Sequence, residues 1–389
     1  HRVFAALTFM HGNGICVLDL VKLGEIVFGY PGAANCPIID RLSFSPIKHI
    51  LTRNEQGAAH MASGYARVKK KAGVCTATSG PGATNLITGI ATAYMDSIPM
   101  VALTGQVALP LIGKDAFQEV DITGATLPFV KHSYLVKDGI EIGRIVNEAF
   151  HIANTGRPGP VLIDFPMDLL KAEFDYPDED EEIEVRGYKL PPKANETQIK
   201  KVAKAIKKAK KPLILAGGGV VISDAVEEIR ELVGNTDIPV VSTMMGIGVL
   251  PSDSDNYYGM IGSHGAKKAN MIFNKSDLVI GMGTRLGDRS VANLKGLEDS
   301  KKLIHIDIDP AEIGKNIQPV IPVVGDVKEV LTQLIPLVAD YKTDSAWNDE
   351  LKAIRKDFTP SVRDNDDGFV NPKYFLERLS EKTNSDVYL

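Results

Sequence analysis

Four stretches with side chains or glycines suited to ligand binding each follow a predicted β-strand. They are Tyr30-Pro31-Gly32, Glu55, the loop Ser79–Asn85 with Gly82 and Asn85, and Gln106. The carboxyl ends of parallel strands meet at one edge of a sheet, which is where α/β proteins bind ligands. The glycines leave room for a flat ring, and Glu55, Asn85 and Gln106 offer hydrogen bonds. We therefore predict one binding site built from all four stretches.

Glu55 allows two interpretations. It follows Arg53-Asn54 and opens an alanine-rich segment with helical spacing. A carboxylate in the first turn of a helix is favoured by the helix dipole, so Glu55 could simply stabilise the helix. The other interpretation is an acid that binds a ligand at the carboxyl edge of the sheet. The residues alone leave both open.

Strands and helices alternate along most of the chain, which predicts the elements that would position this site. The predicted strands are Glu25–Phe28, Lys48–Leu51, Gly73–Thr78, Pro99–Thr104, Pro160–Asp164, Pro212–Ala216, Pro239–Ser242, Asp277–Met282, Leu303–Asp307 and Val320–Val324. The predicted helices are Glu55–Val68, Ala83–Tyr94, Ile142–Asn154, Glu196–Lys210, Asp326–Asp340 and Pro372–Lys382. This order is typical of an α/β fold, with two doubly wound, mostly parallel sheets covered by helices on both faces.

Two polar stretches divide the chain into domains. We predict a first domain over residues 1–172, a linker over 173–195 that includes the acidic run Asp178–Glu182, and a second domain over 196–341. A second linker over 342–368 is followed by residues 369–389, which are typical of the start of a third α/β domain. Because that domain would end within its first strand, we expect the chain to be a fragment.

Composition excludes several classes of protein. Of the 389 residues 44% are hydrophobic and 24% are charged, which excludes wholesale disorder. The net charge of −5 argues against a broad nucleic-acid surface, and no apolar run reaches the roughly 18 residues that span a membrane. The three cysteines form no CxxC pair, so we expect a reducing compartment, the cytoplasm.

No familiar metal or phosphate motif is present. The eight histidines form no HxxxH pair, so the sequence predicts no metal ligand in this chain. The triplet Gly217–Gly219 lacks the lysine of a P-loop. It is consistent with a plain strand-to-helix turn or with close approach of the backbone to a ligand at Gly218.

Several segments resemble one enzyme family. They are Gly29–Ala34, Arg53–His60, Thr78–Leu86, Ala116–Asp121 and Thr155–Val161. The first three resemble the pyrimidine-binding domain of thiamine-diphosphate enzymes, and all five together resemble the large catalytic subunit of acetolactate synthase, also called acetohydroxyacid synthase. The resemblance runs from about Gly24 to Leu389. It implies that residues 1–172 bind the pyrimidine of thiamine diphosphate and that residues 196–341 form an FAD-binding-like middle domain.

The resemblance implies a reaction, cofactors and partners. Such enzymes decarboxylate pyruvate and join the two-carbon unit to pyruvate or 2-ketobutyrate, in the biosynthesis of valine and isoleucine. It implies thiamine diphosphate, FAD and Mg²⁺, the Mg²⁺ ligands being expected in the third domain. It also implies a homodimer or tetramer and, as a further possibility, a small regulatory subunit. Because the GDG…N anchor of that domain is absent, the 389-residue chain is expected to be inactive alone.

The resemblance also assigns roles to residues. Glu55 would hydrogen-bond the aminopyrimidine ring nitrogen and favour its imino tautomer, while Phe117 and Gln118 would lie beside substrate and cofactor. Lys131 would attract a keto-acid carboxylate, or would be only a surface cation. The FAD contacts it implies are Arg157, Gly218, His264, Gly265, Gly283, Arg285, Asp307, Ile308 and Asp326. Where the family reads Arg-Phe-Asp-Asp-Arg, this chain has Arg285-Leu286-Gly287-Asp288-Arg289.

Other functions remain open from the sequence. Another thiamine enzyme acting on 2-keto acids, such as pyruvate oxidase, is one, and oxalyl-CoA decarboxylase and glyoxylate carboligase are others. Glu55 argues against glyoxylate carboligase, which lacks that glutamate. The segment Ala116–Glu119 favours acetolactate synthase. From a different class, the chain could be a non-catalytic FAD-binding module.

Overall fold

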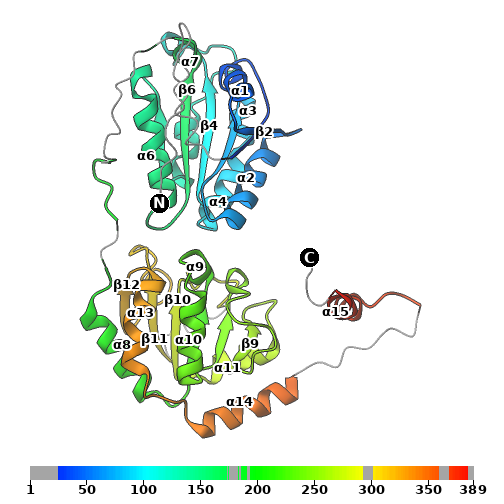
Figure 1. The fold of residues 1–389 in the computed structure, drawn as a ribbon, viewed down its shortest axis with the longest axis vertical. Coiled ribbons are helices and arrows are strands. Elements are labelled where there is room, and N and C mark those ends of the chain that lie inside the picture. Colours follow the sequence, from blue (N-terminus) through cyan, green and yellow to red (C-terminus); the bar gives the residue numbers. More distant parts are fainter. Residues whose placement is uncertain are drawn as a thin grey trace. The chain divides into compact units, whose positions relative to one another are not determined.

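The computed structural model describes residues 25–172, 174, 183, 185–190, 193–291, 301–358 and 368–383. The chain divides into two compact units, His1–Pro191 and Pro192–Leu389, and each is described here by itself. Each unit contains a six-stranded sheet with helices on both faces, as Figure 1 shows. The α/β fold with two doubly wound parallel sheets is therefore confirmed.

The first sheet has the strand order β2-β1-β3-β4-β6-β5, and every neighbouring pair is parallel. Its strands are β1 (Ile26–Gly29), β2 (Lys48–Leu51), β3 (Gly73–Ala77), β4 (Met100–Gln106), β5 (His132–Leu135) and β6 (Pro160–Pro166). Strands β3, β4 and β6 are buried along their whole length, which explains their continuous apolar runs. Because β2 lies on one side of β1 and β3 on the other, the winding reverses beside β1.

The helices of the first unit form two cores, one on each face of the sheet. The α-helices are α1 (Cys36–Ser43), α2 (Glu55–Lys69), α3 (Pro81–Asn85), α4 (Ile87–Met95), α5 (Ile122–Thr126), α6 (Ile142–Asn154) and α7 (Met167–Lys171). Short 3-10 turns occur at Leu109–Leu111, Leu127–Phe129 and Gly139–Glu141. Helices α1, α6 and α7 pack on one face, and α2 to α5 pack on the other.

The small residues of α2 pack inside this unit. A Cβ atom at Gly89 of α4 would lie 2.4 Å from Ala59 Cβ, and one at Gly73 of β3 would lie 2.0 Å from Ala62 O. The close approach of α2 to α4 and β3 accounts for these small residues.

The second sheet repeats this architecture with the order β12-β11-β10-β7-β8-β9, again all parallel. Its strands are β7 (Pro212–Ala216), β8 (Val240–Ser242), β9 (Tyr257–Met260), β10 (Leu278–Met282), β11 (Lys302–Asp307) and β12 (Ile321–Val324). The winding reverses between β7 and β10, so the loops after these two strands lie side by side.

Helices again cover both faces of the second sheet. They are α8 (Glu196–Lys208), α9 (Gly218–Ile222), α10 (Val226–Thr236), α11 (Lys267–Lys275), α13 (Val327–Val338) and α14 (Ser345–Phe358), with a 3-10 turn at Met244–Gly246. A further helix, α15 (Pro372–Lys382), has no buried residue. Residues of α8, α9, α10 and α13 form one core, and residues of α11 and α14 belong to the other.

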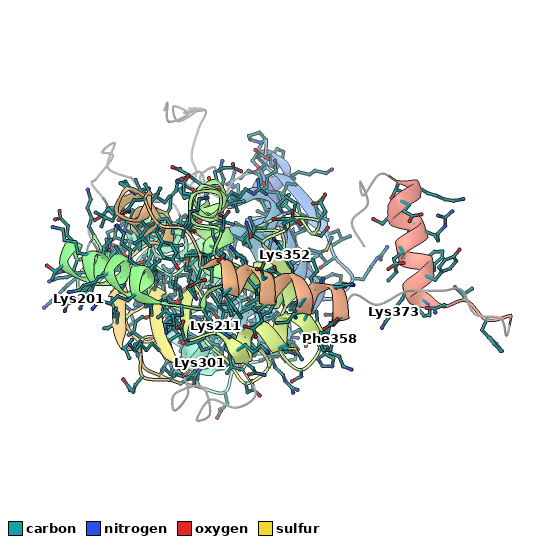
Figure 2. All side chains as sticks on the ribbon, turned by 90° about the horizontal axis from the view of Figure 1, so that it is seen from below. Lys201, Lys211, Lys301, Lys352, Phe358 and Lys373 are labelled. Atoms are coloured by element: carbon teal, nitrogen blue, oxygen red, sulfur yellow. The ribbon has the colours of Figure 1, made fainter. Side chains whose placement is uncertain are left out.

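Helix α14 corrects one prediction. We expected the polar stretch 342–368 to be a linker, but its first part is this helix, which packs against α11 (Figure 2). Trp347 is 1% exposed and donates a hydrogen bond from Nε1 to Pro212 O at 3.2 Å. Glu350 forms ion pairs with Lys211 and Lys275, both at 2.6 Å. The sequence did not predict this helix because its apolar face has only three buried residues and its other face is highly polar.

Two other predicted features fall on residues outside those that the structure describes. The acidic run Asp178–Glu182 is one, and the other is the first strand of the predicted third domain, which we place at Asp386–Leu389. Helix α15 has the predicted bounds, and Asn371 caps it by accepting hydrogen bonds from Lys373 N and Tyr374 N.

Candidate functional site

Thr78 joins two of the predicted stretches at the carboxyl edge of the first sheet. Its Oγ1 accepts a hydrogen bond from Ala34 N at 3.2 Å. A Cβ atom at Gly32 would lie 2.5 Å from Thr78 Cβ, and one at Gly82 would lie 2.8 Å from Thr78 Cγ2. The loops after β1 and β3 are therefore in contact, and two glycines are required by that contact.

Glu55 lies at the same edge, as the first residue of α2. Asn54 caps the helix by accepting a hydrogen bond from Gln56 N at 2.8 Å. Glu55 Oε2 accepts a hydrogen bond from Asn85 Nδ2 at 3.0 Å, and Oε1 lies 3.5 Å from the position of a Cβ atom at Gly82. The structure therefore brings Glu55, Gly82 and Asn85 together, as predicted. The half-buried carboxylate keeps Oε1 beside the bare Cα of a glycine.

The loop with Phe117 and Gln118 reaches the same place. A Cβ atom at Gly80, which has φ +60°, would lie 2.7 Å from Gln118 O. Gln118 itself has φ +59°, a left-handed conformation that is uncommon for a residue other than glycine and that often marks a functional turn. Phe117 is 88% exposed. The ring of Phe117 is therefore open to a ligand at this edge.

Gln106 lies at this edge, but both ends of its amide bond to the protein itself. Nε2 donates to Val120 O at 2.8 Å and to Asp164 Oδ2 at 2.9 Å, and Oε1 accepts from Val107 N at 2.8 Å. The side chain is 3% exposed. Gln106 therefore supports the loop that carries Phe117 and Gln118, instead of offering the free amide that we predicted for a cofactor.

Lys131 and Arg157 lie at the opposite edge of the sheet from Glu55. Lys131 comes just before β5, and Arg157 comes just before β6 and donates from Nε to Ser97 Oγ at 2.9 Å. The seven-residue strand β4 separates the two edges by about 20 Å. Lys131 Nζ donates to Thr155 O at 2.7 Å, to Tyr188 Oη at 3.1 Å and to Ile152 O. Within this unit it serves the end of α6 and does not join Glu55.

In the second unit, glycines bring the loops after β7 and β10 together at the carboxyl edge. Gly219 N donates to Gly283 O at 2.9 Å, and a Cβ atom at Gly217 would lie 2.1 Å from that oxygen. Gly218 is the least constrained of the triplet, since its nearest neighbour would be Met245 Cβ at 2.9 Å. The predicted cofactor residues Gly218 and Gly283 are therefore neighbours at a point where the winding reverses.

Two further predicted segments join this edge. Gly262, with φ +110°, packs its Cα against Arg289 O, and Ser263 N donates to the same oxygen at 3.1 Å. The turn that contains His264 and Gly265 thus contacts the loop that begins at Arg285. Within that loop Leu286 is 1% exposed, so the position at which the family usually has phenylalanine belongs to the hydrophobic core.

The carboxylates of the two acids predicted in the second unit already accept hydrogen bonds from backbone N–H groups. Asp307 is 7% exposed, and its Oδ1 accepts from Asp309 N at 3.0 Å. Asp326 caps α13 by accepting from Lys328 N at 2.9 Å and Glu329 N at 3.2 Å. Ile308 is half-buried directly after β11. These three residues lie at the predicted edge, but local structure already explains both carboxylates.

Sequence reasoning missed the side chains that hold the site loops. Asn35 Oδ1 accepts from Gly32 N at 2.7 Å, and Asn35 Nδ2 donates to Tyr30 O and to Thr76 Oγ1, both at 3.2 Å. Glu119 accepts from Ala116 N at 3.0 Å and from Gly113 N, and these hydrogen bonds lower the pKa of its carboxyl. The only available signal was that both are polar residues within glycine-containing loops.

Two negative findings concern the described residues alone. No group of three or more histidine, cysteine, aspartate or glutamate residues among them is placed to hold a metal ion. None of the helices formed by those residues is both long enough and apolar enough to cross a membrane.

Comparison with protein families matches the two units separately. The N-terminal TPP binding domain of thiamine pyrophosphate enzymes matches residues 20–125, and the central domain of these enzymes matches residues 199–334. Together the two matches span more than half of the chain. The chain belongs to the thiamine pyrophosphate enzymes. The first match includes Glu55, Gly82, Asn85 and Phe117, and the second includes both neighbouring glycine loops of the second unit.

Individual relatives of this thiamine pyrophosphate enzyme chain are acetolactate synthases. The chain is 45% identical to the acetolactate synthase of Mycobacterium bovis, over 98% of this chain and 63% of that protein. It is 47% identical to the probable acetolactate synthase large subunit of Methanocaldococcus jannaschii, over 92% and 61%. It is 50% identical to the acetolactate synthase large subunit of Porphyra purpurea, over 82% and 55%. The chain thus spans about three fifths of the length of these relatives.

Proposed function

We propose that this chain contributes the first two domains of an acetolactate synthase large catalytic subunit. The reaction is the decarboxylation of pyruvate and transfer of the two-carbon unit to a second 2-keto acid, pyruvate or 2-ketobutyrate, in branched-chain amino acid biosynthesis. The observation that carries the proposal is Glu55, hydrogen-bonded to Asn85 and placed beside Gly82. This geometry occurs in a chain that is 45% identical to an acetolactate synthase.

The carboxyl edge of the first unit fits the pyrimidine end of thiamine diphosphate. Gly82 has no side chain to fill the space next to Glu55 Oε1, and Asn85 leaves that oxygen available by bonding Oε2. When bound, thiamine diphosphate supplies the electron sink for decarboxylation. Glu55 would hold a proton at the ring nitrogen of the pyrimidine, and Asn85 would keep the carboxylate in place.

Phe117 and Gln118 would complete the substrate side of this edge. Phe117 offers an exposed apolar ring that can exclude water from the reacting keto acid, and the left-handed turn at Gln118 presses its backbone against Gly80. Lys131 is given no role at this edge, because it lies at the other end of the sheet. Its attraction for a keto-acid carboxylate remains a sequence prediction.

FAD is proposed as the ligand of the second unit. The contact between Gly219 and Gly283 forms a side-chain-free surface where the winding reverses, as dinucleotide sites require, and His264, Gly265 and Arg285 adjoin it. Arg157, Asp307, Ile308 and Asp326 are kept as proposed FAD contacts on the resemblance alone. Mg²⁺ is proposed together with thiamine diphosphate, and we assign it no ligand in this chain.

A homodimer or tetramer is proposed as the working assembly, with a small regulatory subunit as a possible further partner. Exposed apolar side chains on the outer side of α2 and at the end of α4 support a subunit contact. Met61 is 45% exposed, Val68 82% and Met95 53%. The cytoplasm and the limits 1–172 of the first domain are proposed on the sequence evidence, and the second domain is proposed to begin at residue 196 and to include α14.

The proposal is tested with the full-length polypeptide, supplied with thiamine diphosphate, Mg²⁺ and FAD. We expect it to form acetolactate from pyruvate, and Glu55→Gln should lower turnover by about 10²–10⁴ because the amide cannot favour the protonated ring. Glu196→Gln is the matched control. Glu196 also opens a helix after an asparagine cap, but it is exposed on α8.

Two outcomes would contradict this proposal. If Glu55→Gln behaved like Glu196→Gln, Glu55 would be only a helix-stabilising acid. If the full-length protein consumed pyruvate or another 2-keto acid without forming acetolactate, a different thiamine enzyme would be indicated. A protein that binds FAD and catalyses no reaction would be the non-catalytic module.

A further inference from the structure

Segment 107–121 carries Phe117 and Gln118 from the end of β4 to the start of α5. One side chain ties its two ends together: Gln106 Oε1 accepts from Val107 N, and Gln106 Nε2 donates to Val120 O, both at 2.8 Å. An amide side chain can turn over, which exchanges its oxygen and nitrogen. The tie therefore holds only while the nitrogen of Gln106 faces Val120.

Asp164 reinforces that orientation. Its Oδ2 accepts from Gln106 Nε2 at 2.9 Å, and its Oδ1 accepts from Thr104 Oγ1 at 2.7 Å. Both Asp164 oxygens act as acceptors here, so the Gln106 nitrogen points towards Oδ2 as it does towards Val120 O. With the nitrogen fixed, the oxygen of the same amide must face Val107.

A stabilising role alone does not explain this acid. Asp164 is 1% exposed, and a buried carboxylate without a paired cation costs stability. The influences on its ionisation are burial, the hydrogen bonds from Thr104 and Gln106, and the charge of Asp121, with no cation of the described residues among them. Glu119 closes the outer part of the same segment through Ala116 N and Gly113 N.

We propose that Asp164 is a positioning residue that acts through Gln106 on segment 107–121 and so holds Gln118 against Gly80 and Phe117 next to it in the chain. The inference rests on the proposed function, in which these two residues face the substrate. Thr104 and Gln106 form the connection from the buried end of β6 to the exposed loop. The carboxylate touches neither substrate nor cofactor in this account.

Amide hydrogen exchange of the 389-residue chain, followed by mass spectrometry, tests the connection without catalysis. Asp164→Leu keeps a similar volume and removes both acceptor oxygens. We expect the amides of segment 107–121 to exchange about ten- to a hundredfold faster, since leaving one N–H of the buried Gln106 amide without an acceptor costs about 1–3 kcal/mol. Asp164→Asn, which keeps one acceptor for Gln106, should exchange close to the wild-type rate.

Two further variants keep the test decisive. Gln106→Met removes the tie itself and should speed exchange of the same segment, even if Asp164→Leu fails to fold. Thr76→Val is the matched control. It removes a buried threonine hydroxyl on β3 that accepts a hydrogen bond from Asn35 and makes none with segment 107–121. Unchanged exchange of segment 107–121 in the Leu and Met variants would overturn the proposal. Equal acceleration in Thr76→Val would do the same.

Activity of the full-length protein separates this inference from the proposed function. If both hold, Asp164→Leu lowers kcat for acetolactate formation by about tenfold or more, because a small displacement of positioning groups slows the reaction, and Asp164→Asn restores it. If exchange accelerates but kcat does not change, the tie is real and the assignment of Phe117 and Gln118 to the substrate is wrong. A full-length protein without acetolactate synthase activity would contradict the proposed function, while the hydrogen-exchange test of the Asp164–Gln106 connection would remain valid.

Discussion

The two units use the same doubly wound sheet but present different chemistry at their carboxyl edges. In the first unit the edge offers side chains, with Glu55 bonded to Asn85 and Phe117 exposed. In the second, the loops after β7 and β10 approach so closely that Gly219 N bonds Gly283 O. One edge is therefore suited to proton chemistry on a small ring, and the other to backbone contacts along an extended ligand.

A pair of asparagine caps shows that local sequence does not decide this difference. Asn54 and Asn195 each cap a helix whose first residue is a glutamate. Glu55 is half-buried and bonded to a loop 30 residues away, whereas the Glu196 carboxylate is 80% exposed and lies 3.9 Å from Lys200 Nζ. The same local motif is part of a candidate site only where other loops converge on it.

The largest effect on stability is expected from closing the glycine contact of the second unit. Gly283 has φ +56°, and a Cβ atom there would lie 2.5 Å from Gly219 Cα. Gly283→Ala should lower the free energy of unfolding by about 2–4 kcal/mol, through backbone strain and overpacking. Gly287→Ala, in the same loop but with no atom within 4 Å, should change it by less than about 1 kcal/mol.

Tryptophan fluorescence can report the unfolding of the second unit specifically. Trp347 is the only tryptophan of the chain and is buried in the second unit. Denaturant unfolding of both variants should therefore be followed by its emission. Equal stability of Gly283→Ala and Gly287→Ala would show that the two backbones do not approach as described.

A smaller and pH-dependent effect is expected in the first unit. Burial raises the pKa of the Asp164 carboxyl from 3.8 to about 7. The folded unit therefore binds the proton more tightly than the unfolded chain, so stability is greatest below about pH 4 and is lost as the pH rises towards 7. Asp164→Asn should remove this dependence and gain on the order of 2 kcal/mol at pH 8. Chemical denaturation monitored by exchange of β4 and β6 amides measures it, and a wild-type unit as stable at pH 8 as the Asn variant would contradict it.

The second unit should respond to pH in the opposite direction and more weakly. His305 is 1% exposed, its Nε2 lies 2.8 Å from Thr284 O, and burial lowers its pKa below 6.5. The unfolded chain binds the proton more readily, so stability is lost as the pH falls below about 6.5. His305→Gln should make Trp347-monitored unfolding less sensitive to pH between 6.5 and 5, by about 1 kcal/mol. Identical pH profiles of the two proteins would show that His305 does not titrate on unfolding.

Much of the fold followed from sequence because the central strands are buried on both faces. Strands such as Pro212–Ala216 consist of continuous apolar residues between glycines and prolines, so their bounds are confirmed. Helix α14 could not be recognised, since Trp347, Leu351 and Ile354 are its only buried residues among many charges. The short edge strand β5 was missed because none of its four residues is fully buried, so it has no continuous apolar run.

The candidate site was predictable where one residue contacts the loop after a neighbouring strand. Glu55, Gly82 and Asn85 meet because parallel strands end at a common edge. Spacing could not show that the amide of Gln106 is occupied by Asp164 and Val120, since this depends on a contact 58 residues away. Nor could it show that Lys131 precedes its strand at the opposite edge.

The central claim is that Glu55 promotes proton loss from thiamine diphosphate at the first unit's carboxyl edge. The most direct measurement is the rate of hydrogen–deuterium exchange at the thiazolium C2 of the bound cofactor, in the full-length protein without pyruvate. We predict that Glu55→Gln slows this exchange by about 10²-fold or more, while Glu196→Gln leaves it unchanged. Equal exchange rates in the wild type and in Glu55→Gln, at saturating cofactor, would contradict the account.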